Sequence, residues 1–207
     1  MTKKYRSNEN ESSSPFLINV RNNDLSEDVE VNMVKQDTNV IHFYSDIDVQ
    51  SCLTLNKNLR EMDKKLRILN VNYGVDPRIE LRLNTNGGEI FAAMSTIDTI
   101  RDIKTPVDSY VEGAVASAGT LISTCASRRY MYQNARLLIH QMSSEFGGTF
   151  AQFEDEMYNN NNIMKSLKDF YKKYTKIPAK KLEEILKRDI WLSATECLEY
   201  GIIDDIL

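Results

Sequence analysis

Ser117 is the residue of this sequence best placed for nucleophilic chemistry. It stands in the run Gly113-Ala114-Val115-Ala116-Ser117-Ala118-Gly119, where a β-rich segment gives way to a helical one. Small neighbours let a substrate backbone approach. The N-terminus of a helix also offers free N–H groups and the positive end of a dipole, which favour an alkoxide and the oxyanion that it creates. The alternative is structural: a small-residue helix packed closely under a neighbour, with Ser117 as its cap.

His140 and Asp189 could complete a catalytic triad with this serine. His140 follows the apolar run 137–139 at its polar end, and the chain has only one other histidine, His42. A serine-histidine pair also needs a carboxylate that fixes the imidazole tautomer. Asp189 stands alone between a helical segment and an apolar run, where we expect it to be partly buried. A structural histidine and a loop carboxylate paired with Arg188 are the ordinary alternatives.

The glycine pair Gly87-Gly88 supplies a third chemical feature. It follows a strand-like segment, and glycines allow a positive φ and expose backbone N–H groups. The N–H groups of Gly88 and Ala118 would together form an oxyanion hole. A turn that only reverses the chain or caps a helix is the alternative.

Strand-like and helical segments alternate along the chain and would place these residues at strand ends. Apolar residues alternate in the strand-like segments and recur at three- and four-residue steps in the helical ones. The pattern predicts strands at 40–44, 79–83 and 107–111, and helices at 49–69, 90–100 and, after a turn at Gly113, 114–126. Repeated strand-turn-helix units predict a mostly parallel α/β sheet with helical crossovers.

The second half of the chain contains one unusually long helical pattern. Two short strands, at 130–132 and 137–139, precede a predicted helix from about Phe150 to Tyr174. Its apolar residues are too sparse for a fully buried element, so we expect it to pack against another subunit. Pro178 at a helix start and the capping-box spacing in Ser193-Ala194-Thr195-Glu196 predict two more short helices.

Composition excludes several classes of function. The 26 Lys and Arg against 30 Asp and Glu give a net charge of −4, which provides no basic field for nucleic acid. No apolar run is long enough to span a membrane, and the first fourteen residues lack the apolar centre of a signal peptide. We therefore expect a cytoplasmic protein, with the host cytoplasm for a virus-encoded chain and an organelle as the alternatives. Three cysteines without CxxC spacing and two histidines suggest neither a disulfide scaffold nor a zinc site. We expect one domain at 36–207, after a segment 1–35 that begins with a polar, flexible arm.

Four motifs in a fixed order resemble the ClpP family of self-compartmentalising serine proteases, the peptidase partners of AAA+ unfoldases. The motifs extend over roughly residues 40–207 and lie at 84–88, 113–119, 134–141 and 188–204. Asn86, Ala118 and Met142 stand where the family usually has proline, methionine and proline, and none of these changes removes a catalytic atom. The family's glycine-rich strand after the histidine is replaced here by Ser143-Ser144-Glu145-Phe146-Gly147-Gly148.

The resemblance implies a crotonase-like α/β fold of repeated β-turn-α units with a protruding long helix. It also implies a role for each matching residue: Ser117 as nucleophile, His140 as base, Asp189 as orienting acid, the backbone N–H groups of Gly88 and Ala118 as oxyanion hole, and Gly87 and Met142 as substrate contacts.

The function implied by the resemblance is that of an ATP-dependent Clp-type serine endopeptidase, which hydrolyses peptides and unfolded proteins through an acyl-enzyme on Ser117. The family assembles as two stacked heptameric rings fed by an AAA+ unfoldase of the ClpX, ClpA or ClpC type. No cofactor is therefore expected in this subunit, because the partner uses the ATP. Two alternatives stay open: a non-catalytic ring subunit, and a crotonase-type acyl-CoA enzyme that combines the Gly88 and Ala118 donors with a carboxylate base.

Overall fold

The central element of the structure is a seven-stranded sheet. The computed structural model describes residues 39–207, so the expected flexible arm and the boundary at residue 35 lie outside the described residues. The strands follow the order β1-β2-β3-β4-β7, with β5 beside β3 and β6 beside β5. Every pairing is parallel except that of β5 with β6, which confirms the predicted mostly parallel α/β sheet. The strands are β1 (Val40–Phe43), β2 (Ile79–Thr85), β3 (Val107–Ala116), β4 (Arg128–Met131), β5 (Arg136–Leu138), β6 (Trp191–Leu192) and β7 (Asp205–Ile206).

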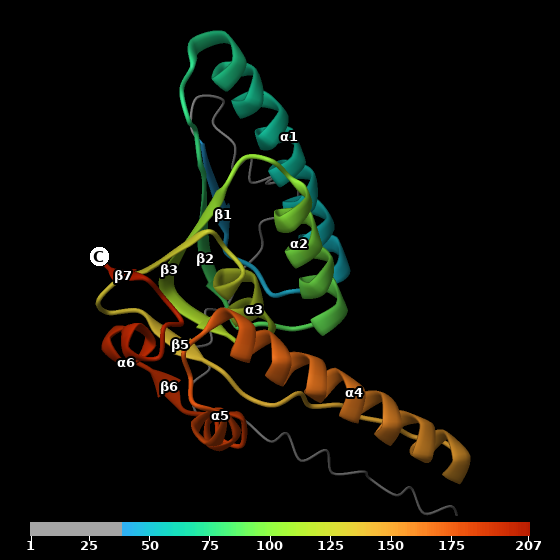
Figure 1. The fold of residues 1–207 in the computed structure, drawn as a ribbon. Helices are drawn as coiled ribbons and strands as arrows, with labels where there is room; N and C mark the ends of the chain where they lie inside the picture. The colour runs from blue at the N-terminus through green and yellow to red at the C-terminus, as the bar shows by residue number, and fades with distance from the viewer. Residues whose placement is uncertain (1–38) are drawn as a thin grey trace, which may run out of the picture. The chain divides into compact units, whose positions relative to one another are not determined.

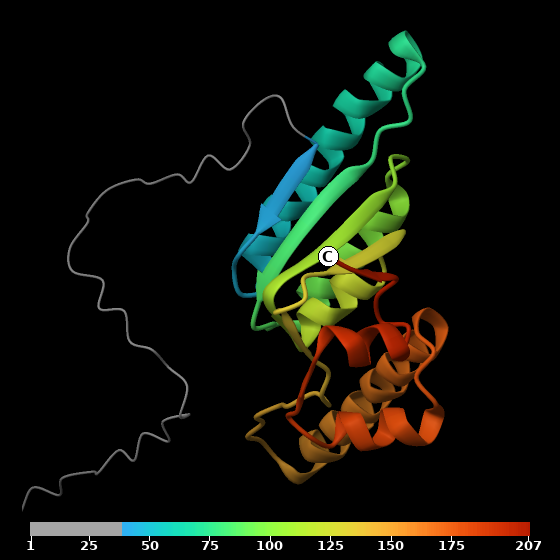
Figure 2. The same cartoon turned by 90° about the vertical axis from the view of Figure 1, so that its left-hand side faces the viewer.

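Three helices cover one face of this sheet: α1 (Val49–Tyr73), α2 (Ile90–Asp102) and α3 (Ala118–Thr124). Figures 1 and 2 show them side by side on the same face of β1, β2 and β3. Strand β2 alternates as a half-covered strand must, because Ile79, Leu81 and Leu83 are buried in the core while the residues between them are not. Each crossover helix follows the strand before it, so the carboxyl ends of β2 and β3 lie at the same edge of the sheet.

Strand β3 differs from the sequence prediction and determines where the candidate nucleophile lies. The predicted turn at Gly113 and helix at 114–126 are wrong, because β3 continues to Ala116 and helix α3 begins only at Ala118. Gly113 has φ +68 and lies in a bulge, where residues 112–114 face Asn84 alone. The bulge lets one strand pair with β4 up to Val111 and with β5 from Ala114.

The long helix α4 spans Phe150–Tyr174, as the sequence predicted. Figure 1 shows its N-terminal half extending away from the sheet. Only Leu167 and Tyr171 are buried along its length, and both lie in its C-terminal half. The exposed large apolar residues in its first half are Phe150, Phe153, Met157 and Tyr158. Residues 139–149, which connect β5 to α4, contain no strand.

Two short helices follow α4, and an arginine of β4 links this C-terminal region to the sheet. Helix α5 (Ala179–Leu186) follows Pro178, and α6 (Ala194–Glu199) begins with the predicted capping box between Ser193 and Glu196. From β4, the Arg129 guanidinium donates to the carbonyls of Tyr174 and Gly201 at 2.6 and 2.9 Å. These contacts hold the C-terminal end of α4 in place. Within residues 39–207, no helix is both long and apolar enough to cross a membrane.

Candidate active site

Ser117 lies at the junction of β3 and α3 in a strained backbone conformation. Its φ is +52, and it is the only non-glycine residue with positive φ among residues 39–207. Such a conformation costs about 1–3 kcal/mol and persists only where the surroundings impose it. The Ser117 N–H donates to the Leu138 carbonyl at 2.9 Å, and the Ser117 carbonyl accepts from the Thr120 N–H at 3.0 Å. Strand β5 and helix α3 therefore hold the residue from both sides.

The glycine loop packs directly against this serine. Gly87 and Gly88 have φ of +95 and +142, and a Cβ on Gly88 would lie 2.1 Å from the Ile47 carbonyl oxygen. A Cβ on Gly87 would lie 2.6 Å from that of Ser117, so both positions require glycine. Two backbone bonds of 2.8 Å, from Ile47 N–H to the Gly87 carbonyl and from Glu89 N–H to the Ile47 carbonyl, fix the loop.

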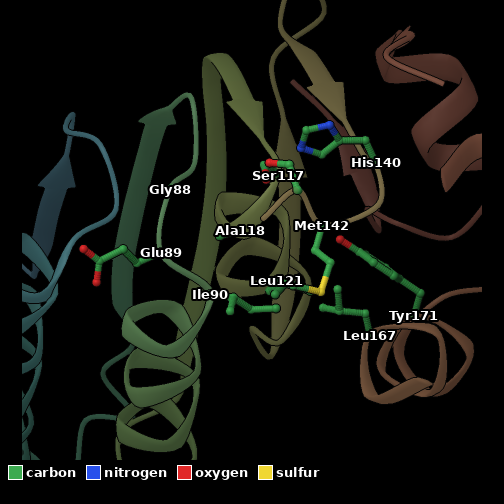
Figure 3. Close-up of a pocket in the computed structure, with 11 residues that line it drawn as sticks. Gly88, Glu89, Ile90, Ser117, Ala118, Leu121, His140, Met142, Leu167 and Tyr171 are labelled. Carbon is green, nitrogen blue, oxygen red and sulfur yellow. The ribbon is translucent and has the colours of Figure 1, made fainter. Parts of the chain in front are cut away.

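The two expected oxyanion donors are both uncommitted. Among the hydrogen bonds of residues 39–207, neither the Gly88 N–H nor the Ala118 N–H is a donor. Both residues line the same pocket as Ser117 (Figure 3). An oxyanion formed at the serine could therefore accept hydrogen bonds from two N–H groups without displacing any hydrogen bond within residues 39–207.

His140 is oriented by Asp189. The imidazole Nδ1 lies 2.8 Å from Asp189 Oδ1, so the other nitrogen, Nε2, is available to the serine. Figure 3 shows the ring beside Ser117, whose hydroxyl has no hydrogen-bond partner among residues 39–207. The Gln141 N–H donates to the Leu186 carbonyl at 2.8 Å, which ties the chain after His140 to the helix that precedes Asp189.

Asp189 is more exposed than the sequence suggested. We expected a partly buried carboxylate, but its side chain is 78% exposed, against 29% for His140. The reason is its place in the exposed turn between α5 and β6, which other elements of residues 39–207 leave uncovered. Asp189 pairs with His140 rather than with Arg188, the alternative partner considered from the sequence.

The pocket beside Ser117 has a volume of about 180 Å³. Its floor is apolar, and Figure 3 shows the side chains converging below the serine. The apolar and aromatic lining residues are Ile90, Leu121, Met142, Leu167 and Tyr171. Such a floor suits an apolar side chain of a peptide. Met142, an expected substrate contact, lines the pocket, whereas Gly87 is buried behind Ser117 and does not.

Sequence reasoning missed most of this floor. Leu167 and Tyr171 come from α4, separated from Ser117 by about fifty residues of sequence, and they are the two buried residues of that helix. Their four-residue spacing places them on one face of α4 and was the only available signal. Glu89 also lines the pocket and is exposed. No group of three or more His, Cys, Asp or Glu side chains within residues 39–207 is placed to bind a metal.

The site brings together a serine, an imidazole that contacts a carboxylate, and two backbone N–H groups that donate no hydrogen bond within residues 39–207. These are the groups that acyl transfer through a serine requires. Comparison with known proteins gives the family. The sequence model described as Clp protease matches residues 33–207. The chain belongs to the Clp protease family and is a peptidase of the crotonase-like fold, as the sequence predicted.

Curated relatives support this assignment. The "ATP-dependent Clp protease proteolytic subunit" of Deinococcus radiodurans is 32% identical over 134 residues, which are 64% of this chain and 66% of the relative. The "ATP-dependent Clp protease proteolytic subunit 1" of Chlamydia muridarum is 35% identical over 157 residues, 73% of this chain and 80% of the relative. The subunit of the same name from Chlamydia trachomatis is 34% identical over 157 residues, which are again 73% of this chain and 80% of the relative.

Proposed function

We propose that this chain is a serine endopeptidase that cleaves peptides and unfolded proteins through an acyl-enzyme on Ser117. The single observation that carries the proposal is the 2.8 Å contact between His140 Nδ1 and Asp189 beside a serine with an uncommitted hydroxyl. This contact fixes the tautomer in which Nε2 accepts a proton.

The reaction follows from these roles. The Ser117 hydroxyl oxygen attacks the substrate carbonyl carbon while His140 Nε2 accepts its proton, and the Gly88 and Ala118 N–H groups stabilise the resulting oxyanion. The oxyanion collapses, the C–N bond breaks, and His140 returns the proton to the leaving amine. Water then attacks the acyl-enzyme, with His140 again as the base, and releases the carboxylic acid and the free serine. The chain's own groups supply each step, so we propose that this subunit needs no metal or cofactor.

The observed His140–Asp189 pair also bears on the two alternatives. A crotonase-type acyl-CoA enzyme would use the oxyanion donors with a carboxylate base, and it would not need an imidazole oriented by a carboxylate. A non-catalytic ring subunit would not need an uncommitted serine beside that imidazole. The hydrogen bond at 2.8 Å therefore favours the peptidase over both.

We further propose that the active protein is an assembly of this chain, arranged as two stacked heptameric rings. Support comes from α4, whose first half presents Phe153 at 50%, Met157 at 64% and Phe150 at 79% exposure. Contiguous exposed apolar side chains of this kind mark interaction surfaces. A neighbouring subunit would also cover Asp189, which the described residues leave exposed.

The names of the relatives suggest the remaining partner. Those proteins are called proteolytic subunits of an ATP-dependent protease, so we propose that ATP is used by an AAA+ unfoldase of the ClpX, ClpA or ClpC type that delivers unfolded substrates to this chain. We propose a cytoplasmic location and neither a nucleic-acid nor a membrane partner, in keeping with a net charge of −4.

The proposed function is tested by comparing the cleavage of short peptides with the cleavage of a folded protein. We expect the isolated protein to cleave short fluorogenic peptides and to leave a folded, tagged protein intact until an AAA+ partner and ATP are added, because entry into an enclosed chamber limits the rate. The measurement is fluorescence release for the peptides and gel densitometry for the protein. Rapid degradation of the folded protein by the isolated chain would contradict the chambered arrangement.

A second expectation concerns the assembly. Met157→Glu should shift the protein from a large assembly toward smaller species, down to the 23.8 kDa chain, because burying an unpaired carboxylate in an apolar contact costs on the order of a few kcal/mol. Sedimentation velocity measures the distribution, and circular dichroism checks that the exposed Met157 is not needed for folding. Asn159→Glu, on the same helix, is the control, since it adds the same charge at a residue that is already polar. Unchanged assembly in Met157→Glu would exclude this surface of α4 from the contact.

A further inference from the structure

The most informative feature outside the triad is a buried hydrogen-bond chain beneath Ser117. The Tyr171 hydroxyl lies 2.6 Å from Thr120 Oγ1, and Thr120 Oγ1 donates to the Ser117 carbonyl at 2.7 Å. A hydroxyl has a single proton, and a carbonyl oxygen can only accept. Thr120 Oγ1 therefore donates its hydrogen bond to the Ser117 carbonyl and accepts one from the Tyr171 hydroxyl. The two hydrogen bonds thus run in one direction, from α4 to the nucleophile.

Both hydroxyl-bearing residues are enclosed by the protein. Thr120 is 0% and Tyr171 is 2% exposed. Burial raises the pKa of the Tyr171 hydroxyl, which keeps it a proton donor at neutral pH. Tyr171 is one of the two buried residues of α4, and its hydrogen bond with Thr120 links the buried face of α4 to α3 beside the serine.

The Ser117 carbonyl, which accepts the last of these hydrogen bonds, shares a peptide unit with one of the proposed oxyanion donors. The planar peptide bond that contains the Ser117 carbonyl also contains the Ala118 N–H, which points the opposite way from the carbonyl. A group that fixes the direction of the carbonyl therefore fixes the direction of the N–H. Two hydrogen bonds hold this carbonyl, from the Thr120 N–H at 3.0 Å and from the Thr120 hydroxyl at 2.7 Å.

We infer that Tyr171 and Thr120 are positioning residues of the oxyanion hole, which act through the Ser117–Ala118 peptide unit. The two hydrogen bonds hold the peptide unit after the strained Ser117 in the orientation that aims the Ala118 N–H into the pocket. Successive hydrogen bonds that run in the same direction also polarise one another. This inference rests on the proposed serine peptidase function. It adds that the packing of α4 at Tyr171 sets the geometry of transition-state stabilisation.

The test is a double-mutant cycle on the hydroxyls. Tyr171→Phe and Thr120→Val each remove a hydroxyl and keep most of the side-chain volume. We expect each to lower kcat on a fluorogenic peptide by about 3- to 10-fold with KM nearly unchanged, less than the loss of an oxyanion donor itself. We expect the double variant to lose no more than the worse single variant, because either change breaks the same chain. Thr120→Ser, which keeps the hydroxyl, should restore kcat to within about 2-fold of the wild type.

Two controls separate positioning from other roles. Thr124→Val makes the matched change in the same helix, at a buried hydroxyl that has no hydrogen-bond partner within residues 39–207, and should leave kcat unchanged. Thr120 does not line the pocket, whereas Tyr171 does. If Tyr171 were only a wall of the substrate pocket, Tyr171→Phe would change KM and Thr120→Val would not reproduce its effect.

A peptide boronate gives a second readout that a purely structural role would not move. Its tetrahedral adduct on serine mimics the transition state, so its affinity should fall in parallel with kcat in both single variants at temperatures well below their melting points. If kcat and boronate affinity were unchanged in active, folded Tyr171→Phe and Thr120→Val, this inference would be overturned and the proposed peptidase function would stand. Wild-type protein that cleaves no peptide would overturn the proposed function, and the inference with it.

Discussion

Ser117→Ala is expected to lower kcat/KM for peptide hydrolysis by about 10³-fold or more, because it removes the oxygen that forms the acyl-enzyme. The fold should be kept. Alanine retains the Cβ that contacts the glycine loop, and the bonds that hold this strained residue involve only its backbone N–H and carbonyl. The rate is measured with a fluorogenic peptide, on protein purified away from any host peptidase.

The matched checks for this variant are thermal melting and sedimentation, both of which should equal those of the wild type. The loss should also be non-additive with His140→Ala, since the members of a triad act as a unit. Peptidase activity near the wild-type rate in Ser117→Ala would remove the serine from the mechanism.

Asp189→Asn is expected to lower kcat by about 10²- to 10⁴-fold while changing KM little. Its carboxylate accepts from His140 Nδ1 at 2.8 Å, whereas an asparagine can present an N–H to that nitrogen and stabilise the tautomer that leaves Nε2 protonated. The stability of the isolated subunit should change little, because the Asp189 side chain is 78% exposed there and an exposed pair contributes at most about 1 kcal/mol.

Asp98→Asn is the control for this substitution, because Asp98 has a similarly exposed side chain at 80% and lies on α2, away from the histidine. Activity in Asp98→Asn should match the wild type. An Asp189→Asn variant as active as the Asp98→Asn control would show that the observed pair with His140 does not support catalysis.

Much of the fold could be predicted because the sequence carries it locally. Strand β2 shows a two-residue alternation of buried and less buried residues, and α4 has the bounds that its pattern indicated. The boundary between β3 and α3 could not be placed in this way. A glycine with positive φ can either end a strand or bulge it, and the choice at Gly113 depends on two different neighbouring strands, β4 and β5.

Some residues of the candidate site could be predicted from the sequence, and others could not. Ser117, His140, Gly88 and Ala118 could be named from the sequence because the motifs around them resemble those of the ClpP family, and the structure brings all four to one pocket. The pocket floor and the Tyr171–Thr120 contact depend on how α4 packs, and residues 51 positions apart in sequence leave no local signal of such a bond. The exposure of Asp189 follows from an absence of covering elements among the described residues, which a sequence pattern does not encode.

The central claim is that Ser117 is an activated nucleophile, and covalent labelling tests it most directly. The intact assembled protein is treated with a fluorophosphonate and digested, and the modified peptide is identified by mass spectrometry. The proposed mechanism predicts one label per chain, on Ser117, with labelling slowed strongly by His140→Ala because the base is lost. A protein that cleaves peptides yet carries no label, or carries it on another serine, would contradict the mechanism.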